Sequence, residues 1–454
     1  MTNFKTLQTD FYQISMAFAY VLSDKANITT GFEGFVRNVK AAVNPNQDFY
    51  IFSGEQEVNN YIETVKREIK DPQFIETLIE LIEPKITAKN KEDIIQEFRE
   101  KWNNLDFDFE YKVVPEGSIV FPLVPVFQYK GPKIWGQLIE TYVTNIYNGR
   151  TAFATLIKLK EENKAFITEN EFEFIKGIIE YNPFAINEYT KNLERTAEEF
   201  RDSTDKILLE AAFRRAPTKI IADIASNVAI SKGWDGTSNV SNVLNGMIPA
   251  EKVGGTMAHA FIMSFENERD AFKAWDRIFP GTTMLIDTYD VENAAKMIKE
   301  MVDSGEITKP NDLRIDSDPI DEYCKLVYDI FDGDIGIFVS GDMDTEKFEI
   351  LDGQNIPYTK AMAGTKYVYE NYIISKLNSG FVYKIVEYIN ENGEIIKPEK
   401  KANGKSNYPG LKMVSYDEFR NILTIWNNTD KGQFGFSGMD EVKPDTKVEF
   451  RTTS

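Results

Sequence analysis

The chain has 454 residues, enough for two or three domains of ordinary size or for one large α/β body with additions. Its 72 Asp and Glu residues outnumber its 52 Lys and Arg residues, and the net charge of −20 repels nucleic acids and anionic membranes. We therefore expect neither as a partner. Any anionic ligand must be held by a local group of cations or through a metal ion.

A single cysteine, Cys324, excludes an intramolecular disulfide and indicates a reducing compartment. No long apolar run follows residues 1–5, and the most hydrophobic stretch, 118–127, is interrupted by Pro122 and Pro125. We therefore expect no signal peptide, no membrane-spanning helix and a cytoplasmic location.

The N-terminal region mixes helical and strand patterns. Asp10 precedes apolar residues at helical spacing and Gln13 stands three positions later, so Asp10 is predicted to cap a helix. Alternating apolar residues predict strands at 30–37, at 48–52 and within 111–129, and charged amphipathic patterns predict helices between 55 and 102. Residues 1–135 are thus predicted to form a β-rich domain that also contains helices.

Helical patterns dominate 136–200, and after them short apolar runs alternate with amphipathic stretches. Four such runs end at Asp287, Asp316, Ser340 and Ala363, about 25 residues apart, as strand and helix units of a parallel sheet do. We predict an α/β fold in which residues 136–365 form an irregular α/β barrel. The tail, 366–454, is predicted to pack on the barrel or to complete the β-rich domain.

The carboxyl ends of parallel strands lie on one face of a sheet, which is where ligands bind. Carboxylates, arginines and glycines on one face suit a magnesium-bound phosphate ester. A single aspartate after a strand more often caps the next helix, but several together favour a site. The residues at these junctions are Asp287, Asp290, Asp316, Asp318, Asp342, Arg214, Arg215, Arg314, Gly341 and Gly364.

His259 is the only histidine of the chain and lies in the glycine-containing segment 254–261. It is the one imidazole that could change protonation or carry a transferred group near pH 7. The glycines before it let the backbone approach a ligand closely. One histidine on an apolar stretch is more often structural, so its assignment depends on the strand ends around it.

Several enzyme classes lack their motifs here. A Walker loop and a Gly-x-Gly-x-x-Gly segment after a strand are absent, which disfavours P-loop kinases and Rossmann dehydrogenases. There is no cluster of cysteines and histidines for zinc, and no serine lies in a nucleophile elbow.

In the histidine segment and the strand-end segments described above, the chain resembles the nicotinate phosphoribosyltransferases, which have the type II phosphoribosyltransferase fold. The resemblance implies condensation of nicotinate with phosphoribosyl pyrophosphate to nicotinate mononucleotide and pyrophosphate, coupled to ATP hydrolysis, in NAD synthesis. The matching segments occur in the family's order and are residues 9–13, 213–216, 235–240, 255–259, 285–290, 314–317, 340–342 and 364–365.

The resemblance also implies roles for individual residues. His259 would be transiently phosphorylated, and Asp287 and Asp316 would lie near the ribose and Mg²⁺, whose ligands stay unassigned. Substrates would further contact Arg214. Tyr12 would stack on the pyridine ring from the neighbouring subunit of a homodimer with a shared active site. The remaining contacts would be Thr256 and Arg314 to nicotinate, and Gly341, Gly364 and Thr365 to the ribose phosphate.

Ser238 bears on the choice of base. Nicotinamide-using relatives carry an aspartate there, which would repel the carboxylate of nicotinate, whereas a serine does not. Nicotinate is therefore favoured, with nicotinamide phosphoribosyltransferase and a non-catalytic ligand-binding relative as alternatives. The chain departs from the family pattern at 316–319, which lacks a glycine, and at Ala211 and Ala212, which replace an aromatic residue and a glycine. Tyr12 would then stack alone, or Phe213 would replace the missing ring. The sequence leaves open whether ATP coupling is obligatory.

Overall fold

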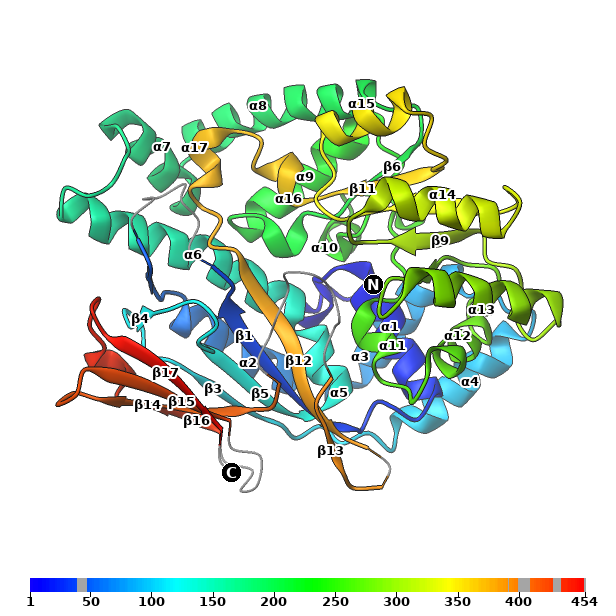
Figure 1. Ribbon diagram of the computed structural model, residues 1–454, viewed down its shortest axis with the longest axis horizontal. Helices are drawn as coiled ribbons and strands as arrows, with labels where there is room; N and C mark the ends of the chain where they lie inside the picture. Colours follow the sequence, from blue (N-terminus) through cyan, green and yellow to red (C-terminus); the bar gives the residue numbers. More distant parts are fainter. Residues whose placement is uncertain (39–46, 391, 399–408, 428–433, 453–454) are drawn as a thin grey trace.

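The computed structural model describes residues 1–38, 47–390, 392–398, 409–427 and 434–452. Helices and strands are mixed throughout (Figure 1). The six-stranded sheet is parallel, the five-stranded sheet is antiparallel, and a four-stranded sheet contains both kinds of pairing. This confirms the predicted α/β class. In the described part of the chain no helix is both long enough and apolar enough to cross a membrane.

The antiparallel sheet joins the two ends of the chain. Its central strand β1 pairs with β5 on one side and with β12, from the C-terminal part, on the other. Figure 1 shows β12 running alongside β1. The C-terminal part thus adds β12 to the β-rich sheet, which is one of the two placements that the sequence left open. In spatial order the strands are β13 (Ile395–Ile396), β12 (Phe381–Ile389), β1 (Thr29–Val36), β5 (Phe127–Pro132) and β3 (Glu110–Val113).

A second, four-stranded sheet follows at the C-terminus and is attached through a buried ion pair. The side chains of Lys412 and Glu33 are 2% and 1% exposed, and Lys412 Nζ contacts Glu33 Oε2. Loss of one partner would leave a buried charge uncompensated. The elements are β16 (Gly435–Ser437), β14 (Lys412–Asp417), β15 (Ile422–Asn427) and β17 (Lys447–Thr452), with the 3-10 helix η5 (Met439–Glu441); β2 (Tyr50–Ile51) and β4 (Ile119–Val120) form a separate ladder.

The parallel sheet has six strands, and its side chains are largely buried because helices cover it. Asp287, Asp316 and Ser340 follow β8, β9 and β10, and Ala363 ends β11, as predicted. In spatial order the strands are β7 (Gly236–Thr237), β6 (Ile207–Glu210), β11 (Lys360–Ala363), β10 (Gly336–Val339), β9 (Asp312–Ile315) and β8 (Met284–Leu285).

The two edges of the parallel sheet approach each other, which gives the fold its irregular barrel form. Val253 bridges to Thr237 of β7 in parallel, and Gly254 N donates to Thr237 O at 3.0 Å. The same segment then leads to His259, whose Nδ1 lies 3.1 Å from the Thr288 hydroxyl just beyond β8. The gap between the edge strands is therefore spanned by the segment that carries the histidine.

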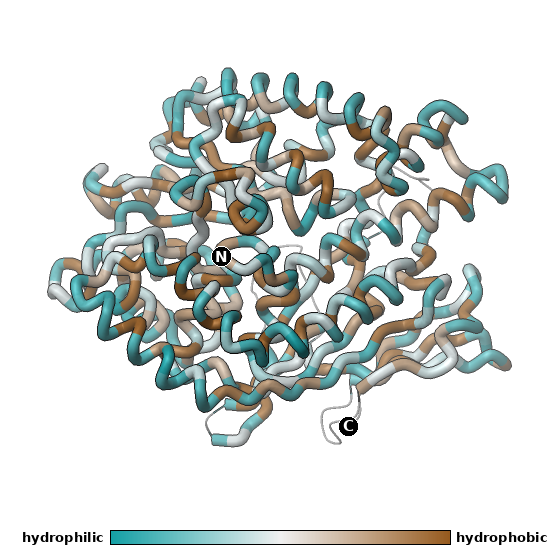
Figure 2. Tube along the Cα trace, turned by 180° about the vertical axis from the view of Figure 1, so that it is seen from behind, coloured by the Kyte–Doolittle hydropathy of each residue, from teal (hydrophilic) through white to brown (hydrophobic). Residues whose placement is uncertain are grey.

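Helices connect and cover the sheets, and their hydrophilic residues face outward while apolar residues lie inside (Figure 2). The first group comprises η1 (Lys5–Leu7), α1 (Phe11–Leu22), α2 (Glu55–Glu68), α3 (Pro72–Ile82), η2 (Glu83–Lys85), α4 (Lys91–Trp102), α5 (Lys133–Leu138), α6 (Glu140–Glu161), α7 (Glu169–Ile179) and α8 (Pro183–Asp202). Those of the parallel part are η3 (Phe213–Arg215), α9 (Lys219–Ser231), α10 (Val240–Leu244), η4 (Ala250–Lys252), α11 (His259–Ile262), α12 (Glu268–Asp276), α13 (Val291–Asp303), α14 (Ile320–Ile330), α15 (Thr345–Gly353), α16 (Thr365–Val368) and α17 (Tyr372–Ser375). The division at residues 135 and 365 stays a prediction.

Candidate active site

His259 lies between the ends of two parallel strands. It is the first residue of the short helix α11, and its side chain is 17% exposed. While Nδ1 is held by Thr288, Nε2 lies 3.9 Å from an oxygen of Asp287 and 3.9 Å from an oxygen of Asp316. The structure thus brings together the three residues that the sequence predicted to be catalytic.

Serine hydroxyls fix both carboxylates. Ser317 Oγ donates to Asp287 Oδ2, and Ser340 Oγ donates to Asp316 Oδ1 at 2.6 Å. Burial disfavours the charged form of Asp316, but hydrogen bonding with His259 and the nearby Arg314 outweigh it and hold the pKa of this carboxyl below its usual range. Asp316 is therefore an anion at neutral pH.

Asp287 and Asp316 suit Mg²⁺ that is shared with a substrate. Their oxygens approach the same nitrogen of His259 and so face a common space. Mg²⁺ commonly binds one or two carboxylates together with substrate phosphates rather than a complete protein cage. The described residues contain no group of three or more His, Cys, Asp or Glu that could hold a metal ion.

Asp290 and Asp318, two of the other predicted acidic residues, do not join this pair. Asp290 caps α13 by accepting from Asn293 N at 2.8 Å, which is the simpler role weighed for such residues. Asp318 is an exposed partner of Lys347 at 3.6 Å, in a loop with a cis Asp318–Pro319 bond where the family glycine is missing.

Arg314 and Thr256 form a corner that is suited to an anion, and Thr256 belongs to the histidine segment itself. Arg314 Nη1 donates to Thr256 Oγ1 at 2.8 Å. Arg314 Nε is buried and has no hydrogen-bond partner among the described residues. Because a guanidinium presents donors in a planar fork, an unused Nε and its neighbour are suited to a carboxylate.

Helix α1 packs directly on the histidine segment, as Figure 1 shows for α1 and α11. A Cβ on Gly255 would lie 2.4 Å from the backbone nitrogen of Tyr12, so the two backbones are in close contact. Nearby, Ala258 N donates to Met16 Sδ at 3.4 Å. The position of Tyr12 is therefore tied to the segment that carries His259.

Tyr12 lies beside Arg214 of its own chain. Arg214 Nη1 is 3.5 Å from the Tyr12 hydroxyl and donates to Glu140 Oε1 at 3.1 Å. Burial raises the pKa of Tyr12 well above its usual value, so the phenol stays neutral. One chain alone thus brings Tyr12 to Arg214, and a stacking role in the neighbouring subunit stays a prediction. Phe213 is only 1% exposed, so its ring offers no open face for a pyridine.

Gly255→Ala should destabilise the protein, whereas Gly254→Ala should not. The added methyl group at 255 collides with the backbone of Tyr12, while nothing lies within 4 Å of a Cβ on Gly254. Overpacking of this kind costs about 1–3 kcal/mol. Urea unfolding of the two variants measures the difference, and equal stabilities would contradict the close contact of α1 with this segment.

Asp10 is the N-cap residue of α1, as predicted, but its side chain does not cap the helix. Its carboxylate makes no capping hydrogen bond and accepts instead from Ser238 Oγ at 2.6 Å and from Thr141 Oγ1 at 2.9 Å. Gln13 likewise donates to Glu140 rather than to the helix start. Ser238 is 4% exposed and its hydroxyl is used by Asp10. Its influence on the choice of base stays a prediction.

Two glycines allow neighbouring strand ends to meet at the predicted phosphate end. Gly341 has φ +95°, and a Cβ there would lie 2.7 Å from Asp316 O. A Cβ on Gly364 would lie 2.4 Å from Ala211 O. Just after Thr365, Lys366 Nζ pairs with Asp344 Oδ2 at 3.0 Å and ties the two loops together.

A group of cations that sequence reasoning did not assemble lies near Arg214. Burial, together with the charge of Arg214 and Arg37, lowers the pKa of Arg215 to about 10. Burial lowers the pKa of Lys384 to about 7, and the charges of Arg37 and, less strongly, of Arg214 also contribute. Arg37 Nε is buried without a hydrogen-bond partner among the described residues. Arg37 extends from β1 and Lys384 belongs to β12, so the antiparallel sheet supplies cations to the end of the parallel one.

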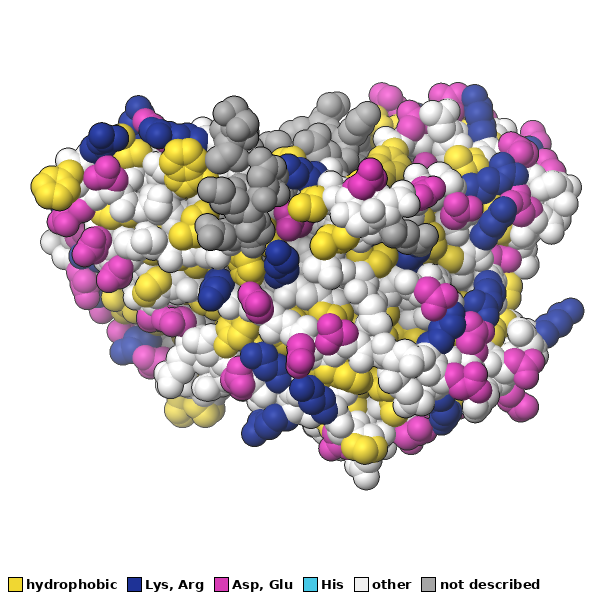
Figure 3. Space-filling view, turned by 90° about the horizontal axis from the view of Figure 1, so that it is seen from below, with side chains coloured by type: hydrophobic (Ala, Val, Ile, Leu, Met, Phe, Trp, Pro, Cys, Tyr) yellow, Lys and Arg dark blue, Asp and Glu magenta, His cyan; other side chains and the backbone are white. Residues whose placement is uncertain are grey.

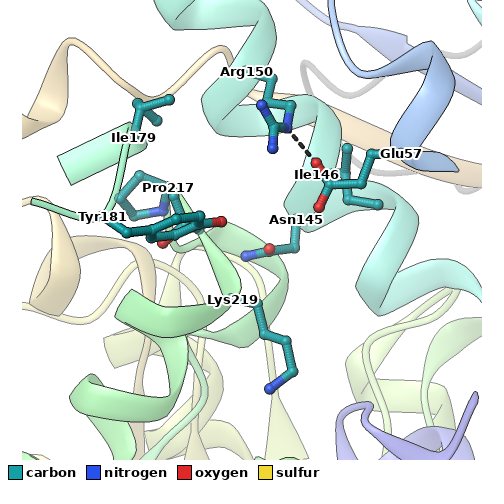
Figure 4. Close-up of a pocket in the computed structure, with 9 residues that line it drawn as sticks. Glu57, Asn145, Ile146, Arg150, Ile179, Tyr181, Pro217 and Lys219 are labelled. Carbon is teal, nitrogen blue, oxygen red and sulfur yellow. Dashed lines mark hydrogen bonds and ion pairs between the residues drawn. The ribbon is translucent and has the colours of Figure 1, made fainter. Parts of the chain in front are cut away.

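A separate pocket is lined by residues of α2 and α6 and by Pro217, Thr218 and Lys219, among others (Figure 4). Asn145 lines it and donates to the carbonyls of Phe213 and Ala216. The two cationic side chains that line this pocket are already paired, Arg150 with Glu57 and Lys219 with Asp223. Asn145 therefore holds the segment that carries Arg214 from the side of this pocket. His259 does not line the pocket. On the face in Figure 3, basic and acidic side chains are interspersed.

Comparison with known proteins places this geometry in a family context. No protein-family model matches the chain. The nicotinate phosphoribosyltransferase pncB2 of Mycobacterium tuberculosis is 24% identical over 416 residues, which are 90% of this chain and 74% of that protein. The nicotinate phosphoribosyltransferase of Caenorhabditis elegans is 31% identical over 264 residues, 58% of this chain and 37% of that protein. The chain is similar to nicotinate phosphoribosyltransferases over most of its length.

The fold agrees with this relationship. The crystal structure of the nicotinate phosphoribosyltransferase from Porphyromonas gingivalis matches with a TM-score of 0.56 at 14% identity, over 90% of this chain and 97% of that one. Relatives in plants and animals also carry the name nicotinate phosphoribosyltransferase. The resemblance inferred from the motifs is therefore confirmed.

Proposed function

We propose that the chain is a nicotinate phosphoribosyltransferase acting in NAD synthesis. The observation that carries this proposal is the convergence of Asp287 and Asp316 on His259, next to the Arg314 corner. In the reaction the pyridine nitrogen of nicotinate attacks C1 of phosphoribosyl pyrophosphate. The bond from C1 to pyrophosphate breaks, and nicotinate mononucleotide and pyrophosphate leave.

The residues of the site match the charges that develop in this reaction. Departure of pyrophosphate leaves an electron-poor ribosyl carbon, which fixed carboxylates such as Asp316 stabilise. Mg²⁺ held by Asp287, Asp316 and the phosphates would take up charge on the leaving group. Arg37, Arg215 and Lys384 form a cationic end that suits the phosphates, and the glycines at 341 and 364 let the neighbouring strand ends pack closely there.

Arg314 supports nicotinate rather than nicotinamide. Its buried Nε has an unused donor, and a carboxylate can accept from Nε and a terminal nitrogen at once. The amide of nicotinamide has one acceptor oxygen and an NH₂ group that would face a cation. The acid is therefore the better partner for this corner.

ATP coupling through His259 is part of the proposal. The γ-phosphoryl group would move from ADP oxygen to Nε2, because Nδ1 is engaged by Thr288. A phosphoryl group adds roughly −1.5 to −2 charges, and here it would stand between two carboxylates. This repulsion raises the free energy of the phosphorylated form, so hydrolysis of the N–P bond can drive a change in the site.

We also propose that the protein works in the cytoplasm as a homodimer. The single, buried Cys324 suits a reducing compartment. The dimer rests on the family resemblance, and sedimentation equilibrium tests it. A monomer at enzyme concentrations that give full activity would exclude a shared site.

A product assay with both bases, with and without ATP, tests the function. With nicotinate, phosphoribosyl pyrophosphate and Mg²⁺ the purified protein should form nicotinate mononucleotide. The kcat/KM for nicotinate should exceed that for nicotinamide by about 30-fold or more, since a buried charge pair is worth about 2–5 kcal/mol. Faster use of the amide would make the protein a nicotinamide phosphoribosyltransferase. Binding of phosphoribosyl pyrophosphate without turnover of either base would make it a non-catalytic relative.

A further inference from the structure

Glu210 is a buried carboxyl group that the proposed chemistry does not use. It is the last residue of β6 and is 0% exposed. Its Oε1 accepts from Ala212 N at 2.5 Å, and its Oε2 accepts from Thr237 Oγ1 at 2.5 Å and from Ser226 Oγ at 2.8 Å. The two oxygens therefore reach different parts of the chain.

Each oxygen holds one turn of the site. Ala212 begins the turn that leads into Arg214, whereas Thr237 begins the turn that contains Ser238. Thr237 Oγ1 accepts from Asn239 N at 3.0 Å, so its single hydrogen is available for Glu210. Glu210 O also accepts from Ser238 N at 2.9 Å. Glu210 thus connects the 211–215 turn to the 236–239 turn through hydrogen bonds.

The connection between the two turns depends on whether Glu210 is protonated. Burial raises the pKa of Glu210 to about 7, while its three hydrogen bonds oppose the rise. The other acidic groups that face it are Asp10, whose charge raises the pKa further, and the buried phenol of Tyr367. The ionised form accepts all three donors. A proton on Oε2 would replace one of the two hydrogens donated there, and Ser226 could then give its hydrogen to Ala222 O at 3.0 Å.

We propose that Glu210 is a positioning residue for the base-binding end of the site, setting the turn that carries Arg214 against the turn that carries Ser238. This inference rests on the proposed function, because it assigns both turns to binding of the pyridine acid. Glu210 itself touches no reacting atom.

Thr237→Val and Thr237→Ser give a matched test. Valine keeps the shape of threonine but removes the hydroxyl, whereas serine keeps the hydroxyl. Thr237→Val should raise the KM for nicotinate about tenfold, the effect of losing one hydrogen bond to a charged group. The KM for phosphoribosyl pyrophosphate should change much less, because the 211–215 turn, which also carries Arg215, stays bonded to Glu210 through Ala212 N. Thr237→Ser should restore the wild-type KM. Equal rises in both KM values, or no rise in Thr237→Val, would overturn the inference.

Glu210→Gln supplies the second arm. The KM for nicotinate of the double variant Glu210→Gln/Thr237→Val should be no higher than that of the poorer single variant, because both changes disrupt the same hydrogen bond. If instead the two effects multiply, the residues act independently and the inference falls. In the wild type the KM for nicotinate should rise as the pH falls below about 7, and Glu210→Gln should flatten this profile. An unchanged profile would also overturn it.

Unfolding measurements test the raised pKa of Glu210 without an activity assay. Its pKa is raised in the folded state, so its favourable contribution is present below the unfolded pKa and is lost as the pH rises through about 7. Relative to Glu210→Gln, the wild type should therefore lose stability between pH 4.5 and 7.

Failure of the proposed function can be told apart from failure of this inference. A wild-type protein that makes no mononucleotide refutes the function. A crystal structure of Thr237→Val then decides the inference, because the two turns should separate there and an unmoved 236–239 turn would refute it.

Discussion

His259→Ala should abolish labelling of the chain by γ-labelled ATP and remove the ATP-dependent gain in rate. The imidazole is the only one in the chain, and Nε2 lies between Asp287 and Asp316, where a phosphoryl group would meet the reacting sugar. Loss of a positioned group of this kind lowers a rate by roughly 10²- to 10⁴-fold. The ATP-stimulated rate should fall by this factor.

The ATP-independent rate should change far less. Asp287 and Asp316 are held by Ser317 and Ser340 and not only by the histidine, so the carboxylates that stabilise the ribosyl carbon remain in place. Thr288→Val is the matched control, because it removes the partner of Nδ1 while leaving the phosphate acceptor. It should reduce labelling without abolishing it. Label that survives alkali in His259→Ala at the wild-type level would exclude His259 as the acceptor.

The parallel strand ends could be predicted because their signals are local. An apolar run followed by Asp or Ser marks a strand and its end, and β8 to β11 end where these runs do. Parallel connections then place the ends on one face. The same reasoning explains why Asp287, Asp316 and His259 could be grouped, although it gave no distances between them. Ser317 and Ser340 directly follow these strand ends and could have been assigned to them.

Other features depend on contacts between distant parts of the chain. Asp10 fits a local capping pattern, yet its carboxylate bonds Ser238, 228 residues away, because the buried donors there satisfy it better than a helix start open to water. Lys384 has no local signal at all. It reaches the site only because β12 pairs with β1 across the length of the chain, which no periodicity within 381–389 indicates.

The buried Glu210 illustrates the same limit in another way. A glutamate after an apolar run looks like any polar strand end. Only the fold places Thr237 and Ser226 within reach of the carboxyl group. A charged residue without exposure is therefore recognisable in the structure and not in the sequence.

Arg314→Met should raise the KM for nicotinate by about 30- to 1,000-fold, since removing one partner of a buried charged pair costs roughly 2–4 kcal/mol. Methionine keeps much of the apolar stem but removes every donor. Turnover of nicotinamide should fall much less, because the amide does not need the cation. The specificity for the acid over the amide should therefore collapse, measured as the ratio of the two kcat/KM values.

Arg314→Lys separates charge from geometry. Lysine restores the positive charge without the planar fork, and the bond to Thr256 at 2.8 Å is made by a terminal nitrogen of that fork. Its KM for nicotinate should lie between those of the wild type and Arg314→Met. Lys384→Met removes a cation near the phosphate end and should raise the KM for phosphoribosyl pyrophosphate while leaving that for nicotinate nearly unchanged. If Arg314→Met kept its preference for nicotinate, the carboxylate would have to be read elsewhere in the site, and Ser238 with its partner Asp10 would be the next group to examine.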